Sequence, residues 1–345
     1  MSPKLRNTLS IIFVFISIAA VIIIAFSNQE LGDAWAAMSS LDIRWVCGIL
    51  LCWAAYPFFD SMGTWFCVRD SKSGISVGRT FVSTIIGLFY SNITPSAAGG
   101  QPMQVNSLRK AGVPVGMGTM AATTRFVSNQ IVVSAASLIL LLTHRAFVYE
   151  QLDGAIWAVR LGWIINFSAV PLVLLAAFRR DWIQKAARWV TGLLHRIKIV
   201  KDEEYAVSAV TATLDTYHTA FIDLVRSPGR IILQLLSSLL SFAGLFGAAY
   251  FVYRAFGLQG VPAGRLITIS SLLYVSASYT PLPGASGAQE GGFLLYFQGI
   301  FTNGTIGVAL LVWRFFTYYL FLIVGAAVVL LEKFLAKKNV TARGK

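Results

Sequence analysis

The sequence predicts an all-α, polytopic integral membrane protein. Hydrophobic residues make up 56% of the 345 positions, charged residues make up only 12%, and the mean hydropathy is +0.69. A soluble domain of this length needs more charge on its surface. Several apolar runs also approach the ~20 residues that a helix needs to cross a bilayer. A large soluble helical protein with an unusually apolar core does not account for those runs.

The apolar runs predict about six full spans. The first, over residues 9–27, is long and lacks a small-residue cleavage site, so we interpret it as a retained span rather than a signal peptide. The other full spans are predicted over residues 44–67, 114–142, 155–178, 230–254 and 305–331. Two further apolar stretches, over residues 80–108 and 266–300, are interrupted by Gly/Pro clusters and are predicted to form helical hairpins.

The charges of the loops predict an orientation. In a chain this apolar, the net charge of +13 indicates basic cytoplasmic loops rather than a nucleic-acid partner. If each interrupted stretch returns to the membrane face from which it starts, most of the 28 Lys and Arg residues fall on the same face. If either stretch crosses the membrane, this charge bias is lost. We therefore predict two re-entrant hairpins that enter from opposite faces, both termini in the cytoplasm, and a multi-pass position in the cytoplasmic (plasma) membrane.

The domain organisation follows from the same pattern. Residues 1–345 are predicted to form a single transmembrane domain of two related halves, over about residues 44–178 and 229–335. The hydrophilic segment 179–228 connects these halves. Its first part separates basic residues from an apolar face, which predicts an amphipathic helix on anionic lipid, with a solvated linker helix as the alternative. Its later part is predicted to be a helical connector.

A motif of small residues occurs once in each half. Each copy begins with a Thr-Pro turn, at Thr94 or Thr280, and is followed by a span with one intramembrane arginine, Arg125 or Arg314. Copies that enter from opposite faces are typical of inverted repeats, whose discontinuous helices meet near the midplane. Unwound turns are tolerated at that depth only where they line a polar cavity or are covered by protein. The sequence therefore predicts a polar centre between the hairpins.

Two interpretations of the intramembrane arginines stay open. Ionised groups at such depth are costly unless they are paired or hydrated, so the arginines either pair with Glu290, Asp60 or carbonyls, or bind a lipid phosphate. These roles can coexist. The predicted substrate-binding residues are Thr94, Gly99, Gly100, Gln101, Arg125, Thr280, Gly284, Gly287, Gln289, Glu290 and Arg314. The glycines are predicted to let the backbone approach the phosphate, and the glutamate to contact a cationic headgroup or hold an arginine.

The sequence offers no set of catalytic or metal-binding residues. The three cysteines fall in or beside one apolar stretch and the three histidines lie far apart, so no metal-ligand spacing occurs. A GxxxxGK[ST] motif and a nucleophilic Ser/His/Asp arrangement are also missing. We therefore predict no cofactor, no metal ion and no catalytic residue.

Several short motifs carry a resemblance to a known family. They are Asn92 to Gln101, Asn106-x-x-Arg109-x-x-Gly112, Arg125, Pro283-Gly284-Ala-Ser-Gly287-Ala-Gln-Glu290 and Arg314-x-x-x-Tyr318. With these motifs, about residues 8–335 resemble the lysylphosphatidylglycerol synthase transmembrane-region family, also called flippase-like membrane proteins. One departure is Ser128, three residues after Arg125, where many relatives have an Asp. This departure weakens the expectation of an Arg–Asp pair on that helix.

The resemblance implies a membrane domain that moves a charged or glycosylated lipid between leaflets, without an ATPase of its own. The expected partners are an anionic phospholipid, aminoacylated phosphatidylglycerol included, or a glycolipid. In bifunctional members, this region is fused to a soluble domain that transfers lysine from lysyl-tRNA to phosphatidylglycerol. We expect no such domain here, since the chain ends shortly after the last predicted span. Phosphatidylglycerol lysyltransferase activity and a non-transporting scaffold for a separate lipid-modifying enzyme stay open, as does a homo-oligomer.

Overall fold

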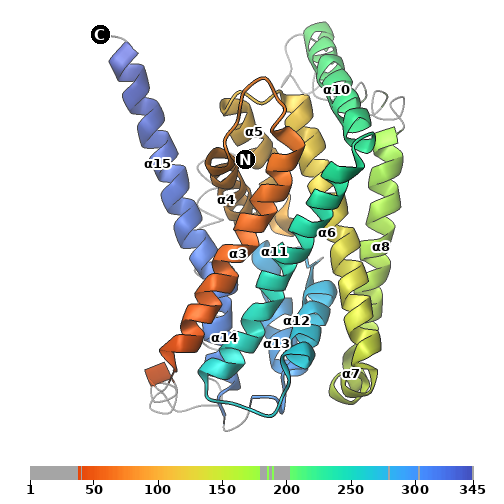
Figure 1. Ribbon diagram of the computed structural model, residues 1–345, viewed down its shortest axis with the longest axis vertical. Coiled ribbons are helices and arrows are strands. Elements are labelled where there is room, and N and C mark those ends of the chain that lie inside the picture. The colour runs from red at the N-terminus through yellow and green to blue at the C-terminus, as the bar shows by residue number, and fades with distance from the viewer. Residues whose placement is uncertain are drawn as a thin grey trace.

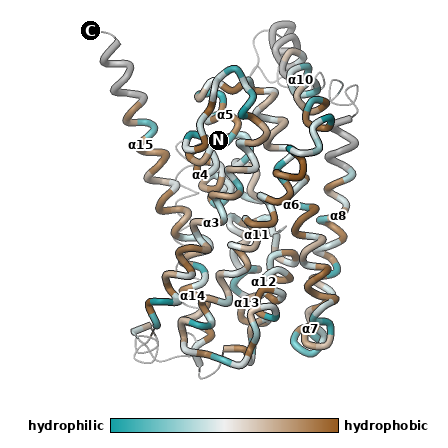
Figure 2. Tube along the Cα trace, in the orientation of Figure 1, coloured by the Kyte–Doolittle hydropathy of each residue, from teal (hydrophilic) through white to brown (hydrophobic). Residues whose placement is uncertain are grey.

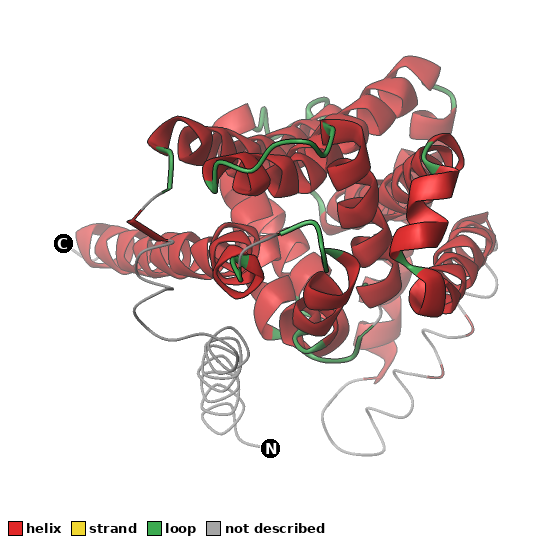
Figure 3. Ribbon diagram, turned by 90° about the horizontal axis from the view of Figure 1, so that it is seen from below, coloured by secondary structure: helices red, strands yellow, loops and turns green. Residues whose placement is uncertain are grey.

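The computed structural model describes residues 38–39, 41–178, 185, 189, 203–278, 280–301 and 304–343, and over these residues the chain is helical with no strand (Figure 3). Four of the described helices are long and apolar enough to cross a membrane. They are Ile43–Val68, Val115–Thr143, Pro228–Ala255 and Ile306–Leu335. The predicted all-α class with membrane-spanning helices is therefore confirmed.

These helices lie close to the predicted spans. Helix α3 (Ile43–Val68), α6 (Val115–Thr143) and α11 (Pro228–Ala255) begin and end within a few residues of the apolar runs. The last span consists of α14 (Ile306–Arg314), a π-helical turn η4 (Phe315–Tyr319) and α15 (Leu320–Arg343).

The remaining predicted spans and the connector correspond only in part to the described helices. Helix α8 (Ile156–Phe178) coincides with the predicted span 155–178 but is not one of the four helices named above. Helix α10 (Glu203–Val225) forms the later part of the predicted connector. The predicted span 9–27 lies outside the described residues, as does the predicted amphipathic helix apart from positions 185 and 189. The total of six spans therefore stays a prediction.

Both interrupted stretches are broken at their Gly/Pro clusters. Helix α4 (Val77–Ile93), the short turn η1 (Pro95–Ala97) and α5 (Gly100–Lys110) form one helical hairpin, here called the first hairpin. Helix α12 (Ala263–Ala277), η3 (Pro283–Ala285) and α13 (Ala288–Tyr296) form the second hairpin. In Figure 1 the first hairpin occupies the upper part of the bundle and the second the lower part, and their turns η1 and η3 contact each other.

Helices α3 and α11 form the central pair of the bundle. They cross the molecule side by side in opposite directions and make the most extensive contact between any two elements (Figure 1). Small residues allow this approach, since a Cβ added at Gly244 of α11 would lie 3.0 Å from the carbonyl oxygen of Cys52 on α3. Close backbone approach through small residues is a common way to pack helices in a membrane.

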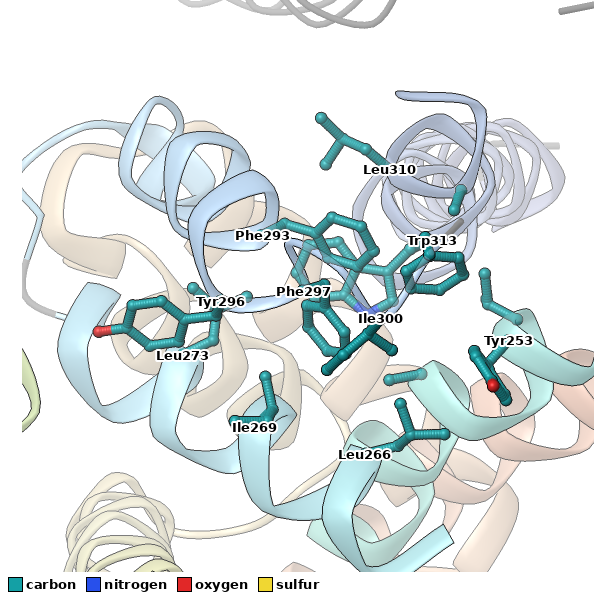
Figure 4. Packing of buried hydrophobic residues seen from close by; sticks show 14 of the residues in the cluster. Tyr253, Leu266, Ile269, Leu273, Phe293, Tyr296, Phe297, Ile300, Leu310 and Trp313 are labelled. Atoms are coloured by element: carbon teal, nitrogen blue, oxygen red, sulfur yellow. The ribbon is translucent and has the colours of Figure 1, made fainter. Parts of the chain in front are cut away.

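Apolar side chains gather into separate clusters around the two hairpins. The cluster around the second hairpin is the larger and includes Phe293, Phe297 and Trp313 (Figure 4). The cluster around the first hairpin includes Leu108 and Met120, together with aromatic residues of α10. Figure 2 shows hydrophobic residues along the middle of the helices and hydrophilic residues toward the connections at both ends.

Candidate functional site

A central cavity of about 620 Å³ lies where the two hairpins meet. Its walls come from both hairpin turns and from α3, α6, α11, α12 and the last span. The polar and charged residues that line it are Tyr56, Ser91, Asn92, Ser96, Gln101, Arg125, Asn129, Gln130, Ser270, Tyr274, Ser278, Thr280, Gln289, Arg314, Thr317 and Tyr318. These residues form more than half of the lining, so the cavity is more polar than a typical small-molecule pocket, whose walls are mainly apolar.

The second hairpin is held by a buried ion pair. Arg314 donates from Nε and Nη2 to Glu290 Oε1, at 2.6 Å in each case, and also donates from Nη2 to the carbonyl oxygen of Gly284 at 3.1 Å. The other carboxylate oxygen of Glu290 accepts a 2.6 Å hydrogen bond from the backbone N–H of Gly287, at the start of α13. Only 4% of the arginine side chain and 2% of the glutamate side chain are exposed. A pair this deeply buried needs the additional hydrogen bonds to offset its desolvation.

A second ion pair joins two spans next to the first hairpin. Arg125 of α6 donates from Nη1 to Asp60 Oδ2 of α3, and this carboxylate is 2% exposed. Ser128 stands where many relatives have an Asp, and the carboxylate that pairs with Arg125 comes instead from Asp60 on another helix. Arg125 is 13% exposed and lines the cavity, so its pair is less enclosed than the pair of the second hairpin.

The turn of the first hairpin is closed without a charged side chain. Thr94 accepts from the backbone N–H of Gly99 at 2.9 Å and donates to the carbonyl oxygen of Tyr90 at 2.6 Å. Ser96 and Ala97 adopt positive φ angles of 50° and 55°, a conformation that costs roughly 1–2 kcal/mol in a residue with a Cβ. The first turn therefore stores backbone strain at two residues, whereas the second turn has one such residue, Ala285, with a φ of 51°.

Tyr318 connects the two hairpins. Its hydroxyl donates to the carbonyl oxygen of Asn92 at 3.1 Å, and the Arg314 guanidinium carbon lies 4.7 Å from the centre of its ring. Gly284 makes room for the ring, because a Cβ there would lie 2.1 Å from it, and its φ of 61° also favours glycine. The residue belongs to the π-helical turn η4 directly after Arg314, a kind of bulge that occurs frequently at functional sites.

Two buried donors at the cavity have no acceptor. Among the described residues, neither Arg125 Nε nor Trp313 Nε1 has a hydrogen-bond partner, and both residues line the cavity. A buried donor without a partner costs about 1–3 kcal/mol. An occupant with acceptor oxygens would satisfy both donors.

The structure brings six of the eleven predicted site residues to the cavity wall. They are Gln101, Arg125, Thr280, Gly284, Gln289 and Arg314. The other five shape the turns instead, and their predicted role in lipid binding stays a prediction. Thr94 and Gly99 close the first turn, while Glu290 and Gly287 hold the start of α13. A Cβ at Gly100 would lie 1.8 Å from Ser91 Oγ, so this glycine lets α5 approach α4.

Several wall residues were not in the predicted set. Asn129 and Gln130 follow Arg125 on α6 and line the cavity, as do Tyr56, Tyr274 and Tyr318. The two amides stand within an apolar span, and this pattern was available in the sequence. Nothing in the spacing of the tyrosines distinguishes them from aromatic core residues.

The described residues contain no group of three or more His, Cys, Asp or Glu side chains arranged to hold a metal ion. The side chains that line the cavity offer guanidinium, amide and hydroxyl groups for polar contacts.

The helices, their composition and the polar centre define a helical membrane protein. The chain belongs to the family described as Lysylphosphatidylglycerol synthase TM region, which it matches over residues 8–325. It is also 25% identical over 259 residues to a UPF0104 membrane protein of Archaeoglobus fulgidus, which covers 73% of this chain and 75% of that protein. No solved structure matches the chain.

Proposed function

We propose that this protein moves lipid headgroups between the leaflets of the cytoplasmic membrane through the central cavity. The observation that carries the proposal is the meeting of two broken-helix turns and two buried arginine–carboxylate pairs around one cavity. A single structural ion pair needs neither a second copy nor a polar space beside it. The membership of a membrane-protein family and the four apolar helices support a membrane location.

The proposed topology has two re-entrant hairpins in an inverted repeat. The first hairpin starts and ends at the upper end of the bundle and the second at the lower end, as Figure 1 lets the reader follow. Exposed basic residues at the upper end include Arg69, Lys72, Arg109, Lys110 and Arg226. In the proposed topology the positive-inside rule assigns this end to the cytoplasm, and α15 ends on the same side.

In this proposal the cavity replaces water around the headgroup while the acyl chains stay in the bilayer. Both arginines are already neutralised by carboxylates, so their remaining N–H groups offer hydrogen bonds to phosphate oxygens, and the phosphate charge is balanced by a cationic group of the headgroup itself. The amides of Gln101, Gln289 and Asn129 offer further donors and acceptors. Headgroups that carry both phosphate and amino or hydroxyl groups satisfy this mixture best, because each kind of wall residue then has a partner.

The test is transport in liposomes that contain the purified protein and a fluorescent phospholipid. Dithionite bleaches only the outer leaflet, so a transported label is bleached completely whereas a static one is bleached by half. We expect complete bleaching with the unmodified chain and a loss of at least tenfold in rate for Gln101→Leu combined with Gln289→Leu. These amides line the cavity without being part of either ion pair, so the substitutions spare the charged groups.

Arg79→Gln is the matched control. Arg79 pairs with Glu332 away from the cavity wall, so its loss removes an ion pair without changing the proposed path. We expect its rate to stay within twofold of the unmodified chain. Static lipid with folded, unmodified protein would reject the proposed function. Equal rates for the cavity variant and the control would reject the proposed path. A scaffold function predicts static lipid. The transferase alternative predicts lysyl-phosphatidylglycerol in the lipid extract of cells that express this chain alone.

A further inference from the structure

A second hollow of about 440 Å³ lies between α5 and α6, beside the first hairpin. We call it the α5–α6 groove. Its α5 wall is formed by Gln101, Pro102, Val105, Asn106 and Arg109, which recur at helical spacing along one face. Its α6 wall contains Thr119, Ala122 and Thr123 at the same kind of spacing. The groove is therefore built from two aligned helix faces rather than from an irregular loop.

The groove and the central cavity share two wall residues. Gln101 and Pro102, in the first turn of α5, line both spaces. From there the groove follows α5 to Arg109, in the last turn of that helix. The eight-residue separation corresponds to about 12 Å along a helix at 1.5 Å per residue. That length is close to half of the ~30 Å hydrocarbon thickness of a bilayer, so in the proposed topology, with Arg109 at the interface, Gln101 lies near mid-membrane depth.

Arg109 differs from the two cavity arginines in its charge balance. Its Nη2 donates to the amide oxygen of Asn106 at 3.1 Å, and no carboxylate pairs with it among the residues that the structure describes. Arg125 and Arg314 are both paired with carboxylates. The outer end of the groove therefore carries a positive charge that the described part of the protein does not neutralise, whereas the cavity is internally balanced.

We infer that the α5–α6 groove is a lateral access route on which Arg109 captures the phosphate of a membrane phospholipid before the headgroup reaches the cavity. The charge at the outer end, the hydroxyl and amide groups along the walls and the continuity at Gln101 support this occupant. The mostly apolar lining suits a lipid whose acyl chains remain beside the groove. The passage of the headgroup from Gln101 into the cavity rests on the proposed function. The capture of lipid at Arg109 does not depend on it.

A simpler role for Arg109 makes a different prediction. A basic residue in the last turn of α5 also stabilises that helix through its dipole. Lys110 has the same charge in the same turn and is exposed, but it does not line the groove. If only helix stabilisation matters, the two positions are equivalent. If phosphate capture matters, only Arg109 affects lipid in the groove.

The test is photo-cross-linking of the full chain in liposomes, with p-benzoylphenylalanine in place of Thr119 in the groove wall. Cross-linked lipid is quantified by mass spectrometry with phosphatidylglycerol and, separately, with diacylglycerol of the same chains but without phosphate. We expect phosphatidylglycerol to dominate, and Arg109→Gln to lower its yield about fivefold, the factor that ~1 kcal/mol per basic residue near an anionic membrane surface implies. Lys110→Gln should leave the yield within twofold, and Arg109→Lys should retain most of it.

Ile139 provides the control for unspecific lipid contact. It is exposed on the same helix at a distance from the groove, so a cross-linker there should capture both lipids equally and respond to neither charge change. Equal yields of the two lipids at Thr119, or equal effects of Arg109→Gln and Lys110→Gln, would overturn the inference. Loss of the cross-link with inorganic phosphate at constant ionic strength would indicate a free-anion site instead. Phosphate-selective capture without transport would reject the proposed function alone, and transport that Arg109→Gln leaves unchanged would reject the access route alone.

Discussion

The two hairpins share a sequence motif but are restrained in different ways. The second is fixed by charge, since Glu290 holds both Arg314 and the N–H of Gly287, and the arginine also binds the carbonyl of Gly284. The turn of the first is closed by the Thr94 hydroxyl, its helices are joined by neutral hydrogen bonds between Ser83 and Ser107 and between Gln104 and Thr84, and its turn residues are exposed. The corresponding arginine, Arg125, pairs with a separate span instead of with the hairpin.

Because the two hairpins are restrained differently, we assign them different roles. The second hairpin is a fixed wall of the cavity, packed inside the larger apolar cluster. The first hairpin has no ion pair at its turn, adjoins the α5–α6 groove and is tied to the last span through Tyr318 and through the Arg79–Glu332 ion pair. Elements that move in function are drawn from the less stable parts of a fold. The following predictions test this asymmetry, beginning with the largest expected effect.

Glu290→Ala should destabilise the protein by about 3–5 kcal/mol, because it leaves the Arg314 charge buried without a partner and removes an acceptor at the start of α13. The measurement is equilibrium unfolding in mixed micelles. The double variant Glu290→Met with Arg314→Met should recover part of the loss, since it removes both charges. A double variant less stable than the single one would contradict the assignment of the loss to an unpaired charge.

Asp60→Ala should destabilise by about 2 kcal/mol, less than Glu290→Ala, because Arg125 lines the cavity and is partly exposed to it. The same unfolding measurement ranks the two variants. If Asp60→Ala proves the more damaging, the pair next to the first hairpin is the stronger anchor and the proposed asymmetry is reversed.

Tyr318→Phe should cost about 1 kcal/mol, the usual value of one hydrogen bond, and should act on the first hairpin. The lost bond ends on the carbonyl of Asn92, so hydrogen exchange should accelerate over residues 88–100 and stay unchanged over residues 284–296. Phe315→Leu, on an exposed position of the same turn, is the control. Faster exchange in both hairpins would show that Tyr318 holds the whole centre rather than one side.

Ser96→Gly should stabilise the protein by roughly 0.5–1 kcal/mol, since glycine adopts the positive φ of this position without a steric penalty. The flexibility that glycine adds to the unfolded chain offsets part of the gain. Gly284→Ala, the opposite change in the second turn, should destabilise because the new Cβ meets the Tyr318 ring. Destabilisation by Ser96→Gly would show that the first turn is not strained.

The sequence predicted those parts of the fold that depend on neighbouring residues alone. Apolar runs predicted the spans α3, α6 and α11, and the Gly/Pro clusters predicted the breaks at Thr94 and Thr280, because the backbone itself cannot continue there. The prediction that both arginines need partners was equally local, since an isolated charge cannot remain at that depth.

What could not be predicted depends on contacts between distant segments. Asp60 was one of several candidate partners, and only the packing of α3 against α6 selects it for Arg125. Tyr318, which reaches Asn92, lies in a π-helical turn of the last span, and no residue spacing indicates that turn. The α5–α6 groove likewise requires two helix faces to align, which the sequence of either helix does not specify.

The most direct test of the account is the sidedness of the two hairpin bases. In a chain whose native cysteines are replaced by serine, Lys72→Cys and Lys110→Cys mark the base of the first hairpin, and Gln259→Cys and Gln298→Cys mark the base of the second; all four positions are exposed. A membrane-impermeant maleimide added to intact cells should label the second pair and leave the first pair unlabelled until the membrane is permeabilised. Labelling of both pairs from the same side would contradict two hairpins that meet from opposite faces.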